Sequence, residues 1–181
     1  MIPKKVEEAF VEQIKHEFDS AYLYLAMSAW FDGEGLVGMA RWMRAQAQEE
    51  VTHGMRFFKQ IRDRGGRVKL FGLAEPAAEW ASPLAAFEAA YKHEQFITGR
   101  INLLSKLSRD ENDFASQGML QWFVDEQVEE EESTLAVAQK LKLVANDGRG
   151  LLMLDTELGQ RTFVLAPELA VLFAQAAAGA A

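Results

Sequence analysis

Glu50 and His53 lie three residues apart in the first half of the chain, a spacing that could bind a metal ion. Residues three apart on an α-helix project from nearly the same face, so a carboxylate and an imidazole at this spacing can share one ion. An isolated Glu-x-x-His pair is a weak indication, because such pairs are also common on solvated helix surfaces. Here Glu50 belongs to a mostly apolar stripe at helical spacing, which comprises Met43, Ala47, Glu50, Gly54, Phe57 and Ile61. A carboxylate on a stripe that faces a core needs a partner, and a metal ion is a candidate.

The composition limits both the class of protein and the ligands that a metal could have. The chain has 181 residues, of which 49% are hydrophobic and 25% charged, as is ordinary for one globular domain with a sizeable core. Its 27 acidic and 19 basic residues give a net charge of -8, which argues against a non-specific nucleic-acid binder and favours cations as partners. Because there is no cysteine, a metal must be held by carboxylate, imidazole and amide groups, which favours oxygen-loving metals.

The sequence shows neither a secretion signal nor a membrane anchor. Its first residues lead directly into charged side chains without an apolar signal region, and no apolar run approaches the ~18 residues of a membrane span. We therefore expect a cytoplasmic protein that binds neither membranes nor nucleic acid.

Apolar residues recur at intervals of three and four along most of the chain, which predicts an all-α fold. Glycine pairs and polar turns separate the periodic segments. The predicted helices are 4–31, 36–64, 83–109 and 114–144. Residues 67–82 lack this periodicity and contain Pro76, so they predict a long crossover that allows the second and third helices to run parallel.

These helices predict a four-helix bundle over residues 1–146, followed by a short fifth helix and an apolar extension over residues 147–181. The last stretch, 168–181, is rich in alanine, too short to span a bilayer and too apolar for a free tail. We expect it to form a small helix that packs against the bundle or against another subunit.

The two halves of the chain match each other at an offset of 77 residues. The matched pairs are Phe10 with Phe87, Glu17 with Glu94, Met43 with Leu120, Glu49 with Glu126, Glu50 with Gln127, and His53 with Glu130. The halves therefore look like two copies of one helical hairpin. The polar members of these pairs lie on or beside the apolar stripes of four different helices, which predicts that they meet inside the bundle.

The bundle interior would then contain four carboxylates, those of Glu17, Glu50, Glu94 and Glu130. Burying an unpaired carboxylate is costly, neighbouring carboxylates raise one another's pKa, and no Arg or Lys lies on these stripes to compensate. Two divalent cations would neutralise the four charges, with His53 as the nitrogen ligand. Di-iron and di-manganese bundles use one Glu from each of two helices and Glu-x-x-His from each of the others. Here Gln127-x-x-Glu130 replaces the second Glu-x-x-His, which predicts two unequal metal positions.

With these residues the chain resembles the bacterial non-haem ferritins over about residues 6–158. The likeness rests on Glu17 followed seven residues later by Tyr24, and on the motifs QEEVTH at 48–53, YKHEQ at 91–95 and QWFVDEQVEEE at 121–131. The resemblance implies a ferritin-like bundle with a short fifth helix, assembled into a hollow shell of about 24 subunits. Such a shell oxidises ferrous iron with dioxygen or hydrogen peroxide and stores it as a ferric oxyhydroxide mineral.

The resemblance also implies a ligand set for two irons in each subunit. One iron would be bound by Glu17, Glu50 and His53. The other would be bound by Glu50, Glu94 and Glu130, so that Glu50 bridges the pair.

Further residues take supporting roles by the same resemblance. Gln127 would lie beside the first iron as a hydrogen-bonding neighbour, and Tyr24 would lie beside the pair as a one-electron donor. A third iron position would comprise Glu49, Glu126, Glu129 and Glu130. The haem-binding bacterioferritins fit less well, because Val51 stands where their haem-ligating methionine is expected, so we expect no haem.

Several alternatives share the predicted bundle. A non-storage di-iron peroxidase or oxidase is disfavoured because the chain has no rubredoxin-like cysteine module and no evident substrate pocket. Miniferritins, which build their site between subunits, and a purely structural role for the carboxylates fit worse. His16 and His93 flank the predicted ligands, so we expect them at the surface or at an interface rather than in the site. The sequence leaves open the oxidant, the iron capacity, and whether residues 160–181 line the shell, plug a four-fold channel or lie outside.

Overall fold

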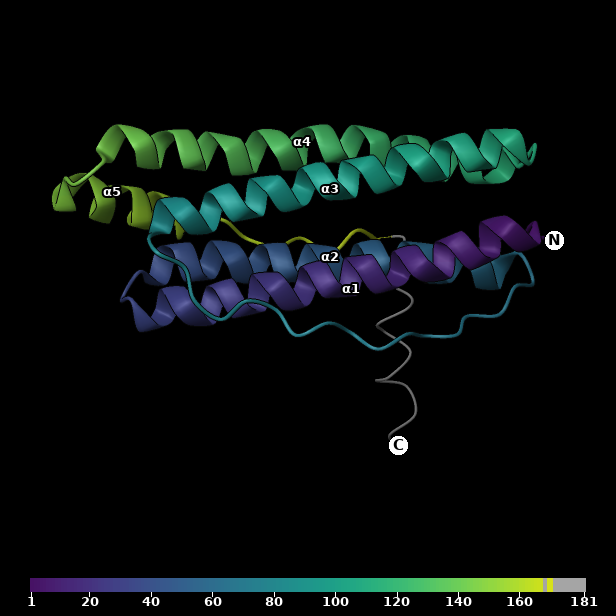
Figure 1. Ribbon diagram of the computed structural model, residues 1–181, viewed down its shortest axis with the longest axis horizontal. Coiled ribbons are helices and arrows are strands. Elements are labelled where there is room, and N and C mark those ends of the chain that lie inside the picture. The colour runs from purple at the N-terminus through teal and green to yellow at the C-terminus, as the bar shows by residue number, and fades with distance from the viewer. Residues whose placement is uncertain (168, 171–181) are drawn as a thin grey trace.

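The computed structural model describes residues 1–167, 169 and 170 of the chain. Five helices lie in this part: α1 Lys4–Gly33, α2 Val37–Asp63, α3 Pro83–Asp110, α4 Phe114–Val144 and α5 Gly148–Leu158. The four long helices lie side by side in one bundle, with α5 across one end (Figure 1). Their bounds confirm the predicted helices closely, and the largest difference is that α1 ends at Gly33 rather than at Phe31. No helix in the described part of the chain is long and apolar enough to span a membrane.

The ends of the long helices follow from local sequence signals. Gly35 takes a φ of +77° in the turn between α1 and α2, a conformation that suits a residue without a Cβ atom. At the start of α3, the Ser82 hydroxyl accepts a hydrogen bond from the Ala85 amide at 3.1 Å, and Pro83 occupies the first turn. Asp113 precedes α4 as predicted, but its carboxylate makes no cap bond and instead accepts two hydrogen bonds from Arg64, at 2.6 and 2.8 Å.

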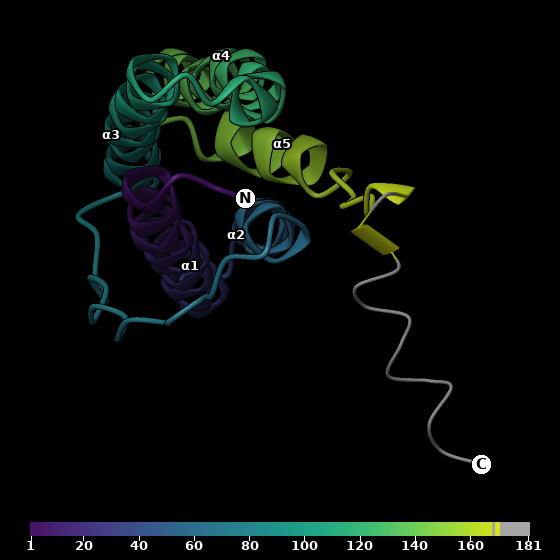
Figure 2. The ribbon, with the colours of Figure 1, turned by 90° about the vertical axis from the view of Figure 1, so that its right-hand side faces the viewer.

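The connection between α2 and α3 spans the height of the bundle. Residues 66–80 form neither helix nor strand, and the connection runs along the outside of the bundle from one end to the other (Figures 1 and 2). The connection contacts α1 through a hydrogen bond from the Ala74 amide to the Asp19 carboxylate, at 3.0 Å. The crossover and the parallel course of α2 and α3 are therefore as predicted.

The bundle has two apolar clusters with a polar layer between them. One cluster includes Tyr24, Phe31, Met43 and Phe87, and the other includes Phe10, Phe57, Ile97 and Phe123. Each of the four long helices contributes to both clusters, and on each helix the predicted ligands fall between the two contributions. The rings of Phe57 and Phe123 stack with centroids 4.4 Å apart, and each lies one helical turn from a residue of the polar layer. Tight apolar packing on both sides isolates the polar layer from bulk water.

Helix α5 packs against α2 and α4, and one of its side chains caps the N-terminus of α2. The buried Asp155 carboxylate accepts hydrogen bonds from the amides of Gly38 and Met39, at 3.1 and 2.8 Å. These amides belong to the first turn of α2, which has no partner of its own there. A Cβ atom on Gly38 would lie 1.7 Å from the Asp155 carbonyl oxygen, so the close approach of α5 requires glycine at this position.

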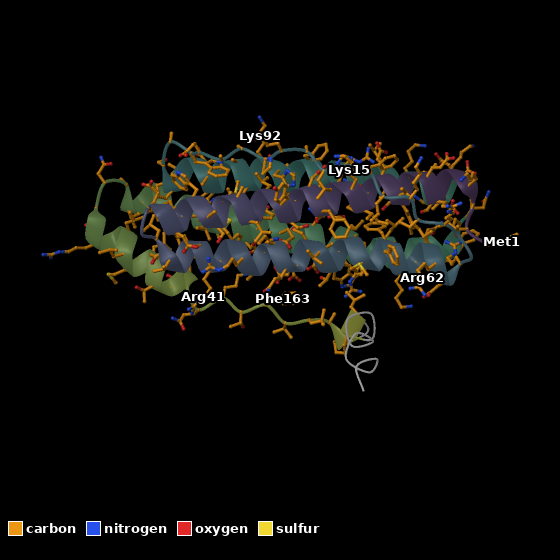
Figure 3. All side chains as sticks on the ribbon, turned by 90° about the horizontal axis from the view of Figure 1, so that it is seen from below. Met1, Lys15, Arg41, Arg62, Lys92 and Phe163 are labelled. Atoms are coloured by element: carbon orange, nitrogen blue, oxygen red, sulfur yellow. The ribbon has the colours of Figure 1, made fainter. Side chains whose placement is uncertain are left out.

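The chain then runs back along α2 in a segment without helix or strand, residues 161–166. Figure 3 shows Phe163 on this segment, beside α2. Leu169 is buried, and it and Ala170 are the only described residues of the stretch 168–181, so the small helix predicted there lies largely outside the described residues.

Candidate metal centre

The polar layer gathers every residue predicted for the dinuclear site. The side chains are Glu17 and Tyr24 from α1, Glu50 and His53 from α2, Glu94 from α3, and Gln127 and Glu130 from α4. None of these residues is more than 4% exposed. Each lies on a core-facing stripe at helical spacing, so the same periodicity that builds the core also brings these polar groups together.

Glu17, Glu50 and His53 form a ready position for one cation. Each offers a ligand atom, and these atoms all lie within 4.8 Å of one another. His53 Nδ1 is 3.4 Å from Glu50 Oε2, and Glu17 Oε2 is buried without a hydrogen-bond partner in the described structure. A buried carboxylate oxygen without a donor is costly, and a cation bound between the three side chains would satisfy it.

The second predicted position is less compact. Gln46 Nε2 donates to Glu50 Oε1 at 3.0 Å and to Glu130 Oε2 at 2.7 Å, so one amide group joins these two carboxylates. Glu94 accepts hydrogen bonds from the Tyr24 hydroxyl and, at 3.3 Å, from Gln127 Nε2. The hydrogen-bond donors therefore take oxygens that a second cation would need.

A second group of three possible ligands is nevertheless present, and it differs from the predicted one. Within the described residues, ligand atoms of His53, Glu126 and Glu130 also lie within 4.8 Å of one another. Glu94 belongs to neither of the two groups. His53 Nε2 lies 3.7 Å from Glu126 Oε1. The imidazole therefore stands between two acidic positions, one deep in the bundle and one toward its edge.

Burial strongly affects the ionisation of these carboxylic acids. Burial and the charge of Glu50 raise the pKa of Glu17 and of Glu130 to about 8. Burial, with the charges of Glu50 and Glu130, raises the pKa of Glu94 well above its ordinary value. Without a cation, Glu17 and Glu130 therefore hold protons at neutral pH, and a bound divalent cation would displace them.

Glu50 and His53 behave in the opposite way, as an ion pair. Burial disfavours the charge on Glu50, but the charge and hydrogen bond of His53 and the hydrogen bond of Gln46 lower its pKa below the ordinary value. Burial likewise disfavours the imidazolium, yet the neighbouring carboxylates of Glu126 and Glu50 raise the pKa of His53 well above its ordinary value. The protonated imidazole thus supplies the positive charge that a metal would otherwise supply.

Of the residues predicted for a third position, Glu130 lies inside the layer and the other three are more exposed. Glu126 approaches His53 as described, Glu129 is exposed, and Glu49 is half-buried. Glu49 is paired with Arg161, whose guanidinium comes from the segment after α5. The helical stripes contain no Arg or Lys, but Arg161 reaches Glu49 from outside the four long helices.

Sequence reasoning missed several polar neighbours of the site. Gln13 Nε2 donates to Glu17 Oε1 at 3.0 Å, just as Gln46 donates to Glu50. Each glutamine precedes its glutamate by four residues, so the shared stripe could have revealed both pairs. Arg161 had no such signal, because it follows α5 and belongs to none of the four long helices.

The two flanking histidines differ from each other. His93 was expected at the surface or at an interface, but it is partly buried between α1 and α3. Its Nε2 atom lies 2.7 Å from Ser20 Oγ, and its ring packs edge-on against Tyr24. Burial lowers its pKa, so it is a neutral hydrogen-bonded neighbour of the site. His16 packs edge-on against Phe96, whose ring also contacts that of His93, and it makes no ring contact with Tyr24 in the described residues.

Comparisons with known proteins agree with this geometry. Residues 7–144 match the model of the ferritin-like domain family. The chain is 36% identical over 163 residues to a bacterial non-heme ferritin of Staphylococcus aureus, covering 90% of this chain and 98% of the relative. It is 35% identical over 159 residues to a probable bacterial non-heme ferritin-like protein of Haemophilus influenzae, covering 88% and 96% respectively.

Solved structures show higher identity. An open pore ferritin from the hyperthermophilic archaeon Archaeoglobus fulgidus is 51% identical, with a TM-score of 0.89 over 90% of this chain and all of the other. An engineered closed form of the Archaeoglobus fulgidus ferritin is 50% identical, with a TM-score of 0.89 over 91% of this chain and all of the other.

Proposed function

The chain belongs to the ferritin family, and from this premise we propose that it oxidises ferrous iron at the buried polar layer and stores the product as a ferric mineral in a hollow cage. The observation that carries the proposal is the cluster of Glu17, Glu50 and His53, which is buried and compact and contains neither arginine nor lysine. Buried acids of this kind are costly in a merely structural role and suit a cation substrate.

We assign the first iron to Glu17, Glu50 and His53. The second iron would be bound by Glu50, Glu94 and Glu130, with Glu50 bridging the two. The second position requires that Gln46 release its two carboxylates, so it should fill after the first. This order gives a physical reason for the unequal positions that the sequence predicts.

The protein groups suit both oxidation states of iron. Carboxylate oxygens are hard anions that stabilise the higher charge of the ferric product, and a single imidazole is compatible with the ferrous ion. Two ferrous ions release one electron each, so they can reduce dioxygen to hydrogen peroxide with the uptake of two protons, or hydrogen peroxide to water. Ligand carboxyls that lose protons when iron binds are a local source of those protons.

Gln127 was predicted to lie beside the first iron, but its amide instead donates to Glu94, a proposed ligand of the second iron. Gln127 and Tyr24 therefore shape the second position rather than bind iron. Both donate to the Glu94 carboxylate and so fix its orientation. The Tyr24 hydroxyl is fully buried beside the pair, where its ring could supply a single electron. Gln127 Nε2 also donates to Thr98 Oγ1 at 3.4 Å, so Gln127 on α4 contacts both Glu94 and Thr98 on α3.

Glu49, Glu126, Glu129 and Glu130 would form the third iron position and lead toward the mineral. The net charge of -8 would also attract cations to the assembled shell. We propose an assembly of about 24 subunits, as the resemblance to ferritins implies. Exposed apolar side chains on α1, such as Tyr22 and Leu25, are compatible with burial in such an assembly.

Iron retention measured together with particle size tests the storage function. Protein freed of metal is loaded aerobically with an excess of ferrous iron and separated by size-exclusion chromatography, and iron is counted per chain. We expect a large particle that retains far more iron than the dinuclear centres can hold. A monomer or dimer that retains only two irons per chain would instead identify a di-iron peroxidase or oxidase on the same bundle.

A further inference from the structure

Arg161 occupies a specific place at the edge of the polar layer. Its Nη2 atom forms an ion pair with the Glu49 carboxylate, and its guanidinium lies over the indole ring of Trp42, with the carbon 4.2 Å from the ring centroid. A guanidinium that is both paired with a carboxylate and stacked on an aromatic ring is held in one orientation. Arg161 is therefore a fixed charge and not a freely moving surface side chain.

The segment that carries Arg161 is itself anchored along α2. Upstream, Arg41 Nη1 donates to the Gly159 carbonyl at 3.1 Å. Downstream, Phe163 and Leu165 face α1 and α2 across an apolar groove lined by Leu25, Ala47, Gln48, Val51 and Thr52. Figure 3 shows this course beside α2. Contacts on both sides thus hold Arg161 against Glu49.

The guanidinium is not fully satisfied where it lies. Its Nη1 atom is buried and has no hydrogen-bond partner in the described part of the chain. Leaving a buried charged donor unpaired is unfavourable, so the arrangement is not one that optimises stability alone. The charge of Arg161 also reaches beyond Glu49, because it opposes the rise in the pKa of Glu130 that burial causes.

These contacts place a positive charge where the third cation would bind. Glu49 can satisfy Arg161 or a metal ion, but Coulomb repulsion disfavours both at once. Glu126, another residue predicted for this position, is still available to a cation, since its contact with His53 Nε2 is long, at 3.7 Å. The guanidinium therefore competes with iron for one carboxylate of the set.

We propose that Arg161 is a tethered cation that holds the third position against iron, so that iron enters it only when the guanidinium leaves Glu49. This inference rests on the proposed dinuclear centre and third position, and it adds a control on the movement of iron from one to the other. Iron would remain at the two inner positions until Arg161 leaves Glu49. The contacts of the segment after α5 would determine how readily Arg161 leaves. Arg161 is thus a positioning residue, which acts through Glu49.

Metal-binding stoichiometry tests the role of Arg161 without any turnover. Zinc, which is not oxidised, is titrated calorimetrically into the metal-free, assembled protein. We expect two zinc ions per chain in the parent and in Arg161→Lys, and three in Arg161→Met and Arg161→Gln. The double variant Arg161→Met with Glu49→Gln should return to two, because the carboxylate that Arg161 guards is then absent.

Arg149→Met provides the matched control, because Arg149 is an exposed arginine near the start of α5. It should bind as the parent does. Two ions in both Arg161→Met and Arg161→Gln, with unchanged affinities and unchanged thermal midpoints, would overturn the inference. Three tightly bound ions in the parent would overturn it as well. Fewer than two in the parent would instead contradict the proposed dinuclear centre itself.

Discussion

Replacing Glu50 by glutamine is expected to slow the initial oxidation of ferrous iron by about 100-fold or more, since even residues that only orient a metal ligand contribute 10- to 100-fold. Glu50 is the residue proposed to contact both irons, so its loss affects both positions at once. The substitution keeps the size of the side chain and removes only its charge. Stopped-flow absorbance after rapid mixing of ferrous protein with dioxygen measures the rate.

Glu88→Gln is the matched control for this experiment. Glu88 lies on the surface of α3, where it is paired with Lys142, and removing its charge should leave the rate unchanged. His53→Ala should be slowed as well, although less, because His53 belongs to one position only. Parent-like oxidation in Glu50→Gln would show that iron is oxidised elsewhere in the protein.

The metal-free protein is expected to lose several kcal/mol of stability as the pH rises from about 5 to 8. The pKa of Glu17 and of Glu130 is about 8 in the folded protein, against 4.5 for an ordinary glutamic acid. Between these values the unfolded chain releases protons that the folded chain keeps, so the unfolded state gains relative stability as the pH rises. His53 acts in the same direction, because its raised pKa gives stability below about 6.5 that is lost at higher pH.

The Glu17→Gln variant isolates one part of this pH dependence. It removes a buried acid that resists ionisation, so the metal-free variant should be more stable than the parent at pH 8 and closer to it at pH 5. Thermal unfolding midpoints of chelator-treated protein across this range measure the difference. Zinc should abolish the pH dependence in the parent, because metal-bound carboxylates are already ionised. A midpoint that is independent of pH in the metal-free parent would contradict the assigned protonation states.

Helical periodicity explains why so much of the fold followed from the sequence. The stripes through Phe10, Glu17, Phe87 and Glu94 repeat every three or four residues, glycines follow α1 and α2, and a capping serine begins α3. The long aperiodic crossover then determined that α2 and α3 run parallel. The four central carboxylates could be predicted because they interrupt apolar stripes, where a polar residue is conspicuous.

The sequence was less informative wherever position depends on contacts outside the periodic helices. Asp155 caps α2 from another helix, and Arg161 reaches Glu49 from the segment after α5, so neither belongs to a stripe. Gln46 was overlooked for another reason, because a glutamine on a core-facing stripe looks like an ordinary polar neighbour until its two carboxylate partners are seen. These three side chains depend on tertiary structure for their roles.

Anomalous diffraction tests the central claim most directly, namely that this chain holds a dinuclear iron centre in its polar layer. Crystals of the assembled protein are soaked anaerobically with ferrous iron and measured on both sides of the iron absorption edge. We expect two strong anomalous peaks per chain, one in contact with Glu17, Glu50 and His53 and one between Glu50, Glu94 and Glu130. A polar layer without any anomalous peak, while iron is bound elsewhere on the chain, would contradict it.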